Sequence, residues 1–203
     1  QLEVLKIVGE RVCTELVESA RQQDLSRPLL WLVHGGPGVG KSETIKLVQS
    51  LFTDVLHWKI GINYQIAALQ AVMAEQLGGD TLHHCCGISS GGLKSEGALP
   101  QGTKRQSEVA KAVLQWRWLI IDEISMISSQ LLAEIDMCLR NIVRNNASGK
   151  LSSAGDVRPF GGINVLFVGD FWQLDPPRGG FLANMPVNFI RRVRKYDPRP
   201  DAA

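Results

Sequence analysis

The sequence predicts an α/β fold in which helices cover both faces of a mostly parallel sheet. Apolar runs of strand length occur at residues 29–33, 118–121 and 163–168, and segments with helical periodicity separate them. Each run is soon followed by glycine or acidic residues. In parallel sheets, ligands bind at the edge where the strands end, so we expect these three stretches to meet in one crevice.

The first third of the chain predicts two helices and two strands. Apolar side chains recur at helical spacing over residues 3–22, and residues 24–28 break that pattern. The run at 29–33 does not alternate polar with apolar residues, so we expect a strand buried on both faces. A helix should extend from 41 to about 52, and the loose alternation over 55–62 suggests a second strand.

The rest of the chain alternates in the same way. Alanine-rich residues 66–77 predict a helix that ends at Gly78-Gly79, whereas 81–86 have no clear type. Helices are expected at 107–115 and 128–143, before the second and third apolar strands. Two glycine- and serine-containing segments are expected to be loops: 87–102 and 145–162.

Composition places the chain among ordinary globular proteins. The 203 residues are 44% hydrophobic and 21% charged, and the net charge of +2 gives no global attraction for nucleic acid. The sequence contains no apolar run long enough for a membrane helix and no signal peptide, although it starts at Gln1 rather than Met. The four cysteines form no C-x-x-C pair, which favours reduced, intracellular use: Cys13, Cys85, Cys86 and Cys138.

A phosphate-binding loop follows the first strand. Its spacing G-x-x-x-x-G-K-[ST] predicts that Lys41 reaches the β- and γ-phosphates of a nucleotide and that Ser42 binds Mg²⁺. Glycines allow successive backbone N–H groups to approach a phosphate, and the following helix directs its positive end at the same anion. The alternative is a tight strand-to-helix turn with an incidental Gly-Lys-Ser. The expected nucleotide-binding residues are Gly35, Gly36, Pro37, Gly38, Val39, Gly40, Lys41 and Ser42.

Two further stretches carry the polar groups that an ATPase needs. Asp122 and Glu123 follow the second apolar strand; Asp122 is suited to hold Mg²⁺ and Glu123 to activate the attacking water. Gln173 follows the third strand and can hydrogen-bond the γ-phosphate or that water. The alternatives are an ordinary surface pair of acids and a simple turn. Phe171 and Trp172 fit either the core or a platform for stacking bases, and for each we favour the core.

Together these stretches resemble the PIF-type (petite integration frequency) DNA helicases of superfamily 1B. The segments that carry the resemblance are GGPGVGKS, GGDTLHH, DEISMI and RPFGGINVLFVGDFWQLDPP, between about residues 29 and 177. The resemblance implies an N-terminal RecA-like P-loop ATPase domain that uses ATP and Mg²⁺ to move 5′-to-3′ on single-stranded DNA. It also implies unwinding of duplexes or junctions in DNA repair, recombination or telomere maintenance. The matching ATPase positions are Lys41, Ser42, Asp122, Glu123 and Gln173.

The resemblance also suggests DNA contacts. The family's T-A-P-T-G-I-A-A is similar to residues 61–68, where Tyr64-Gln65 replaces Thr-Gly, so Tyr64 either stacks on a base or blocks the approach of the backbone. The T-I-H-S-F-A-G-I motif matches 81–88 and points to Thr81 and His83. A metal site in the adjacent residues His83 to Cys86 is disfavoured, because zinc ligands normally come in separated pairs. Gln1 is a candidate for the family's adenine-reading glutamine.

We expect residues 1–28 to be a lead-in helix, 29–177 the ATPase domain and 178–203 an irregular basic tail. Family members have a second RecA-like domain that supplies catalytic arginines, and the residues after Gln173 are too few to form it. We therefore expect a monomeric fragment that binds nucleotide and hydrolyses it slowly. The alternatives are a pseudo-helicase that only binds, and an oligomeric AAA-type ATPase. The expected compartment is the nucleus or mitochondrion in a eukaryote, and otherwise the cytoplasm.

Overall fold

A computed structural model describes residues 1–20, 27–88, 104–146 and 157–183. Its five strands form one sheet in the order β1-β5-β4-β2-β3, and all pairings between them are parallel. The strands are β1 (Leu30–His34), β2 (Tyr64–Ala68), β3 (Asp80–Thr81), β4 (Trp118–Ile121) and β5 (Asn164–Gly169).

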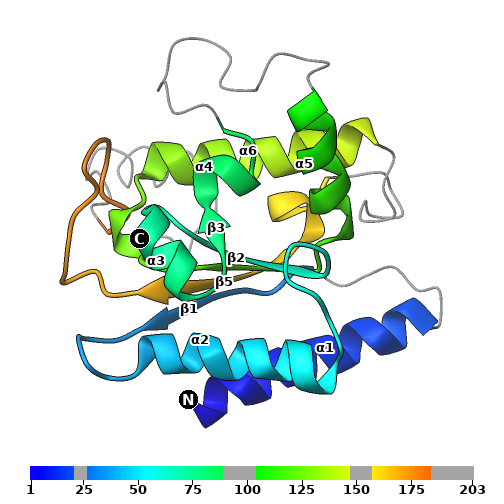
Figure 1. Cartoon of the computed structure of the whole chain (residues 1–203), viewed down its shortest axis with the longest axis horizontal. Coiled ribbons are helices and arrows are strands. Elements are labelled where there is room, and N and C mark those ends of the chain that lie inside the picture. The colour runs from blue at the N-terminus through cyan, green and yellow to red at the C-terminus, as the bar shows by residue number, and fades with distance from the viewer. Residues whose placement is uncertain (21–26, 89–103, 147–156, 184–203) are drawn as a thin grey trace, which may run out of the picture.

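Helices cover both faces of this sheet, which confirms the predicted fold class. Helices α1 and α2 lie on one face, and α5 and α6 on the other (Figure 1). A π-helical turn, Leu51–Val55, extends α2, and two 3-10 turns lie at Ile124–Met126 and Pro159–Gly162. The α-helices are α1 (Leu2–Ala20), α2 (Lys41–Ser50), α3 (Ala71–Gln76), α4 (Leu82–Cys85), α5 (Lys104–Gln115) and α6 (Ser129–Asn145).

Each face has its own apolar core. On the α1/α2 face, Phe52 lies with its ring centroid 5.1 Å from Trp58, 5.1 Å from Tyr64 and 5.5 Å from Trp118. On the opposite face, Ile135 and Leu139 of α6 pack over the strands. Helix α1 belongs to the first core, since its Val8 and Val12 are buried. The lead-in helix is therefore a packed part of the fold.

The structure corrects the prediction for residues 55–77. The second strand is Tyr64–Ala68 rather than 55–62, and α3 begins only at Ala71. Alanine-rich residues from 66 onward favour a helix, but all five residues of β2 are buried between β4 and β3. This burial between two strands overrides the local helix propensity.

Strand β1 is less buried than its apolar sequence predicts. It lies at an edge of the sheet, and Leu30, Trp31 and Leu32 are 43%, 38% and 43% exposed. Within the described ranges, no strand pairs with its outer side. The opposite edge, β3, has only two residues, Asp80 and Thr81, and this short polar edge resists unwanted pairing.

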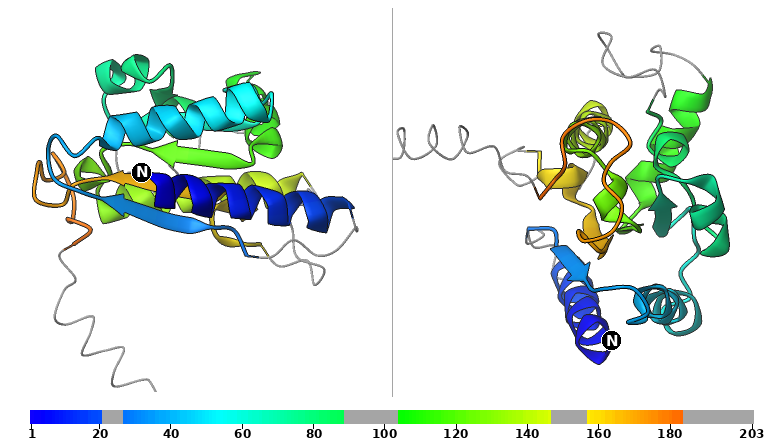
Figure 2. Two further views of the ribbon diagram at one scale, coloured as in Figure 1. Left: turned by 90° about the horizontal axis from the view of Figure 1, so that it is seen from below. Right: turned by 90° about the vertical axis from the view of Figure 1, so that its left-hand side faces the viewer.

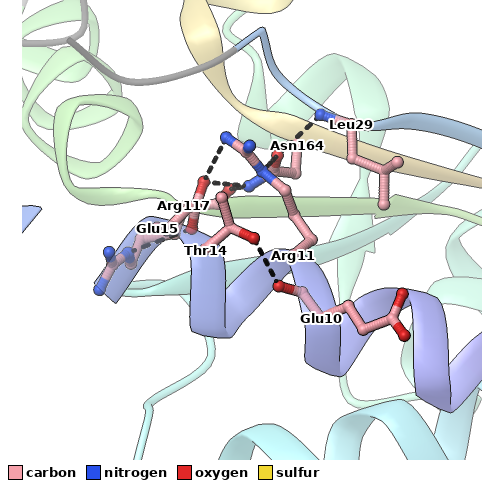
Figure 3. Close-up of polar contacts among 7 residues, drawn as sticks. All are labelled: Glu10, Arg11, Thr14, Glu15, Leu29, Arg117 and Asn164. Atoms are coloured by element: carbon pink, nitrogen blue, oxygen red, sulfur yellow. Dashed lines mark hydrogen bonds and ion pairs between the residues drawn. The ribbon is translucent and has the colours of Figure 1, made fainter. Parts of the chain in front are cut away.

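A buried polar cluster fastens α1 to the end of the sheet where the strands begin (Figure 3). The Asn164 side chain is fully buried: Oδ1 accepts from Arg11 Nε at 3.0 Å and Leu29 N at 2.8 Å. Its Nδ2 donates to Glu15 Oε1 at 2.6 Å and to Arg117 O at 3.0 Å. Arg11 Nη2 also donates to Glu15 Oε1 at 3.2 Å. The cluster thus links α1 to β5 and to the residues directly before β1 and β4.

Candidate nucleotide-binding site

The three sequence stretches predicted to meet do so, because β1, β5 and β4 are neighbours in the sheet. The turn after β1 and the turn after β5 lie at the same end of the sheet, which faces the viewer in the right-hand view of Figure 2. Gly35 N donates to Gly169 O at 3.3 Å and joins the first turn to the end of β5. Residues Asp122 and Glu123 follow β4 at that same end.

The phosphate loop has the backbone that its glycines make possible. Gly38 and Gly40 have φ values of 74° and 86°, a left-handed region that costs other residues energy. Helix α2 begins directly at Lys41, and Thr44 N donates to Gly40 O at 3.0 Å. Lys41 Nζ donates to Gly35 O at 2.7 Å and to Gly36 O at 2.9 Å. Lys41 is thus held over the loop, while Ser42 is exposed in the first helical turn.

The two acids after β4 lie in a partly desolvated environment. Burial raises the pKa of Asp122, against the opposing effects of the Glu123 N–H and the Lys41 ammonium. The pKa of Glu123 is also raised, first by burial and then by the Asp122 carboxylate, while Lys41 opposes the shift. Glu123 has a left-handed φ of 53°, which is unusual for a non-glycine residue. A raised carboxylate pKa suits a general base.

Close backbone packing fixes where these acids lie. A Cβ on Gly169 would stand 2.9 Å from Ile124 N and 3.5 Å from the Glu123 carbonyl carbon, so only glycine allows β5 this close to the acidic turn. Next to it, Asp170 is 1% exposed, and its Oδ1 accepts from Trp172 N at 3.0 Å. Gln173 N donates to Asp170 O at 3.1 Å, and the Gln173 side chain is exposed.

Phe171 and Trp172, the aromatic pair in this turn, differ in burial. Phe171 is partly buried against the core and makes an edge contact with Phe181, with ring centroids 5.8 Å apart. Trp172 is 87% exposed, so the expectation that it belongs to the core is wrong.

The residues present fit a nucleotide with Mg²⁺. The left-handed glycines and the start of α2 direct backbone N–H groups into the loop, which is the arrangement that binds phosphates. The Ser42 hydroxyl and the Asp122 carboxylate are oxygen donors, the type that Mg²⁺ prefers. Gln1 lies on the same side, with Nε2 3.4 Å from Gly40 O. This position is compatible with an adenine-reading role for Gln1.

The expected DNA contacts are only partly accessible. Tyr64 is fully buried in β2 and Gln65 is 6% exposed, so the expectation that they face DNA is wrong. The Ile-Ala-Ala match lies inside the strand, and the turn at the end of β2 is Leu69-Gln70. Thr81 and His83 are partly exposed around the start of α4, where Thr81 Oγ1 accepts from His84 N at 3.3 Å.

Other parts of the chain show features that bear on rival functions. All four cysteines are free thiols, and Cys85 Sγ lies 3.8 Å from Cys86 Sγ. Among the described residues, no three His, Cys, Asp or Glu side chains are arranged to hold a metal ion. In the same ranges, the helices are too short or too polar to cross a membrane. The expected loops at 87–102 and 145–162 and the basic tail lie largely outside the described residues.

Two residues at this end of the sheet have roles that the sequence does not indicate, although it places Asp170 directly after the third apolar strand. Asp170 organises the turn that carries Gln173, and His34, at the end of β1, accepts the Phe171 N–H at 3.3 Å. His34 ends β1 and Asp170 directly follows β5, each beside a recognised motif. Their positions in the sequence could therefore have indicated that they belong to the site. Their mutual contact depends on β1 and β5 being neighbours, which the sequence does not state.

A RecA-like parallel sheet with this loop and these acids defines a P-loop NTPase. The family model described as PIF1-like helicase matches residues 8–180, and the chain belongs to that family. It is 34% identical over 145 residues to the ATP-dependent DNA helicase PIF1 of Candida albicans and 30% identical over 164 residues to that of Homo sapiens. These matches cover 70% and 80% of the chain, but only 14% and 22% of those relatives.

Solved structures give the same likeness. A crystal structure of Bacteroides Pif1 bound to single-stranded DNA matches with a TM-score of 0.56 and 26% identity, over 90% of this chain and 35% of that one. A Bacteroides Pif1 complex with ADP-AlF4 matches with a TM-score of 0.54 and 30% identity, over 74% and 30% of the two chains. The chain therefore spans about a third of these proteins.

Proposed function

We propose that the chain is the first motor domain of an ATP-dependent DNA helicase. The observation that carries this proposal is the convergence of the phosphate loop, the acidic pair and the Gln173 turn on one end of the sheet. Membership of the PIF1-like family supports it, since the matched relatives are named as ATP-dependent DNA helicases. In such an enzyme, hydrolysis of ATP would drive 5′-to-3′ movement on single-stranded DNA and unwinding of duplexes.

Each residue at this end of the sheet has a distinct proposed role. The loop from Gly35 to Ser42 binds the phosphates, and Lys41 moves from the loop carbonyls to the β- and γ-phosphates. Ser42 and Asp122 hold Mg²⁺, which would neutralise charge on the phosphate oxygens. Glu123 accepts a proton from the attacking water, and its raised pKa favours that step. Gln173 contacts the γ-phosphate or the water.

The DNA side of the domain is proposed to follow the ends of β2 and β3. Exposed Gln70, in the turn after β2, and the partly exposed Thr81 and His83 are the candidate contacts. A second RecA-like domain, as in the relatives, would supply the catalytic arginine. A DNA partner is consistent with the nucleus or mitochondrion in a eukaryote, and otherwise with the cytoplasm. The proposed form is a monomer that acts in DNA repair, recombination or telomere maintenance.

The test is ATP hydrolysis by the purified chain, with and without single-stranded DNA. We expect Mg²⁺-dependent hydrolysis, and we expect Glu123→Gln to lower kcat by about 100-fold or more, as for loss of a general base. Nucleotide binding should survive in that variant. Binding without hydrolysis in the parent chain would favour a nucleotide-binding pseudo-helicase. If a fluorescent ATP analogue does not bind at all, the motor-domain proposal is wrong.

A further inference from the structure

His34 lies between the two turns of the site, and the roles proposed above leave it without a task. It ends β1, directly before the phosphate loop, and its side chain is 38% exposed. Its Nε2 accepts the Phe171 N–H at 3.3 Å and lies 3.5 Å from Asp170 Oδ1. The imidazole also stacks on the Phe171 ring, with centroids 5.9 Å apart and planes 18° apart.

The turn that His34 touches is the one that carries Gln173. Within it, Asp170 Oδ1 accepts from Trp172 N, and the Asp170 carbonyl accepts from Gln173 N. Asp170 therefore holds the backbone of this turn through two hydrogen bonds, and His34 contacts Asp170 from the neighbouring strand. A change in the position of the phosphate loop can thus reach Gln173 through one side chain.

We propose that His34 is a positioning residue that couples the phosphate loop to the turn carrying Gln173. The inference rests on the proposed ATPase function, in which Gln173 contacts the γ-phosphate or the attacking water. In this proposal, His34 contacts neither the γ-phosphate nor the attacking water. It holds the turn at the distance from the loop that the reaction needs, so its loss should affect kcat more than nucleotide affinity.

The chemistry of imidazole gives this coupling a measurable signature. Accepting the Phe171 N–H requires the lone pair of Nε2, so the neutral ring carries its proton on Nδ1. A phenylalanine ring at position 34 has no lone pair that could accept this N–H, so the hydrogen bond can be removed while an aromatic ring is kept.

Two substitutions separate the contribution of the aromatic ring from that of the Nε2 hydrogen bond. His34→Phe keeps an aromatic ring against Phe171 and removes the hydrogen-bonding atom. His34→Gln keeps a polar group near the Nε2 position and removes the ring. We expect His34→Phe to lower kcat by about 10-fold with KM within about 2-fold of the parent, and His34→Gln to stay within about 3-fold of the parent kcat. His57→Gln, at an exposed histidine elsewhere, is the matched control and should change neither constant.

A second readout does not depend on hydrolysis. In ¹H–¹⁵N NMR spectra of the parent chain, a non-hydrolysable ATP analogue should shift the Phe171, Trp172 and Gln173 amide signals. That response should be lost in His34→Phe and kept in His57→Gln. Its persistence in His34→Phe would overturn the proposal, as would a parent-like kcat or a rise in KM that matches the fall in kcat. If the parent chain does not hydrolyse ATP, the proposed function fails separately, and the NMR result still decides the coupling.

Discussion

At the amino end of the sheet, where the strands begin, every hydrogen-bonding group of the Asn164 amide has a protein partner. At the carboxyl end, where the strands end, Lys41 uses two of its three donors on partly buried loop carbonyls. Asp122 keeps a carboxylate in a desolvated position that raises its pKa. Polar groups that satisfy one another stabilise the fold, whereas groups left for a ligand cost stability and supply chemistry. The two ends therefore separate stability from function, and substitutions at each end should affect different measurements.

The largest expected effect is on nucleotide chemistry at the carboxyl end. Lys41→Ala should reduce kcat/KM for ATP by at least about 100-fold, because it removes a positive charge directed at the phosphates. The free energy of unfolding should change by less than about 1 kcal/mol, since the two hydrogen bonds lost lie in a partly exposed loop, where water can replace the donor. ATP hydrolysis and urea unfolding measure the two quantities.

Lys46→Ala is the matched control for this prediction. Lys46 lies on the same helix and forms an exposed ion pair with Glu43 at 2.7 Å. Its removal should change neither quantity appreciably. Equal losses of activity in the two variants would mean that the phosphate loop has no special role for Lys41.

The largest expected effect on stability is at the amino end. Asn164→Ala should lower the free energy of unfolding by about 3 kcal/mol, because it leaves the partly buried Leu29 N–H without its acceptor and removes one hydrogen bond each from Arg11 and Glu15. Nucleotide affinity of the folded protein should stay within about 2-fold, since no atom of the cluster lies at the carboxyl end. Urea unfolding and binding of a fluorescent ATP analogue check the two parts.

Asn146→Ala provides the comparison for this substitution. Asn146 is exposed beyond the end of α6, where its Nδ2 donates to Ile142 O at 2.7 Å. The expected loss is less than about 0.5 kcal/mol, typical of surface positions. If both variants unfold at the same urea concentration, the buried cluster does not stabilise the amino end.

The functional residues at the carboxyl end of the sheet could be predicted from the sequence, whereas the polar cluster at the amino end could not, and the reason is physical. Phosphate-binding loops and acidic pairs have local spacing, so Lys41 and Asp122 could be identified without knowing the neighbours of their strands. The Asn164 cluster joins residues of α1 and β5 to Leu29 and Arg117, which directly precede β1 and β4. An asparagine in an apolar strand does not reveal which charges surround it. Long-range pairing creates that cluster, and no local pattern encodes it.

The misplaced second strand has a related cause. The sequence from residue 66 onward has high helix propensity, and only its burial between two strands makes Tyr64–Ala68 extended. The family resemblance, rather than this strand assignment, placed Tyr64 and Gln65 on the DNA side, although both are in the interior. The exposure of β1 was missed for the opposite reason, because an apolar run does not show whether its strand is central or at an edge.

A smaller effect tests whether charge or shape matters at the amino end. Glu15→Gln keeps an oxygen that can accept from Arg11 and Asn164, but removes the charge that faces Arg11 and, at 3.7 Å, Arg117. We expect a loss of about 1–2 kcal/mol, less than for Asn164→Ala, because the hydrogen bonds persist while the charge pairing is lost. Urea unfolding of both variants at one pH makes the comparison. A loss equal to that of Asn164→Ala would mean that charge, rather than the amide, holds the cluster together.

The smallest expected effect has the opposite sign and lies at the carboxyl end. Asp122→Asn keeps the oxygen that accepts the Glu123 N–H at 3.0 Å but removes the desolvated charge. It should raise the free energy of unfolding at pH 7 by roughly 0.5–1 kcal/mol, the usual range for a single stabilising substitution. It also removes one of the charges that raise the pKa of Glu123. The same variant should lose Mg²⁺-dependent hydrolysis.

The pH dependence of the gain in free energy of unfolding from Asp122→Asn identifies the cause of that gain. Because the folded-state pKa of Asp122 lies above the ordinary value of 3.8, the parent loses stability as the pH rises through that folded-state pKa. Below the ordinary value, the carboxyl group is neutral in both states and has no such penalty. The advantage of Asp122→Asn should therefore be greatest at pH 7 and disappear as the pH falls toward 3.8, when measured by urea unfolding. An advantage that is constant with pH would assign the effect to packing rather than to the desolvated charge.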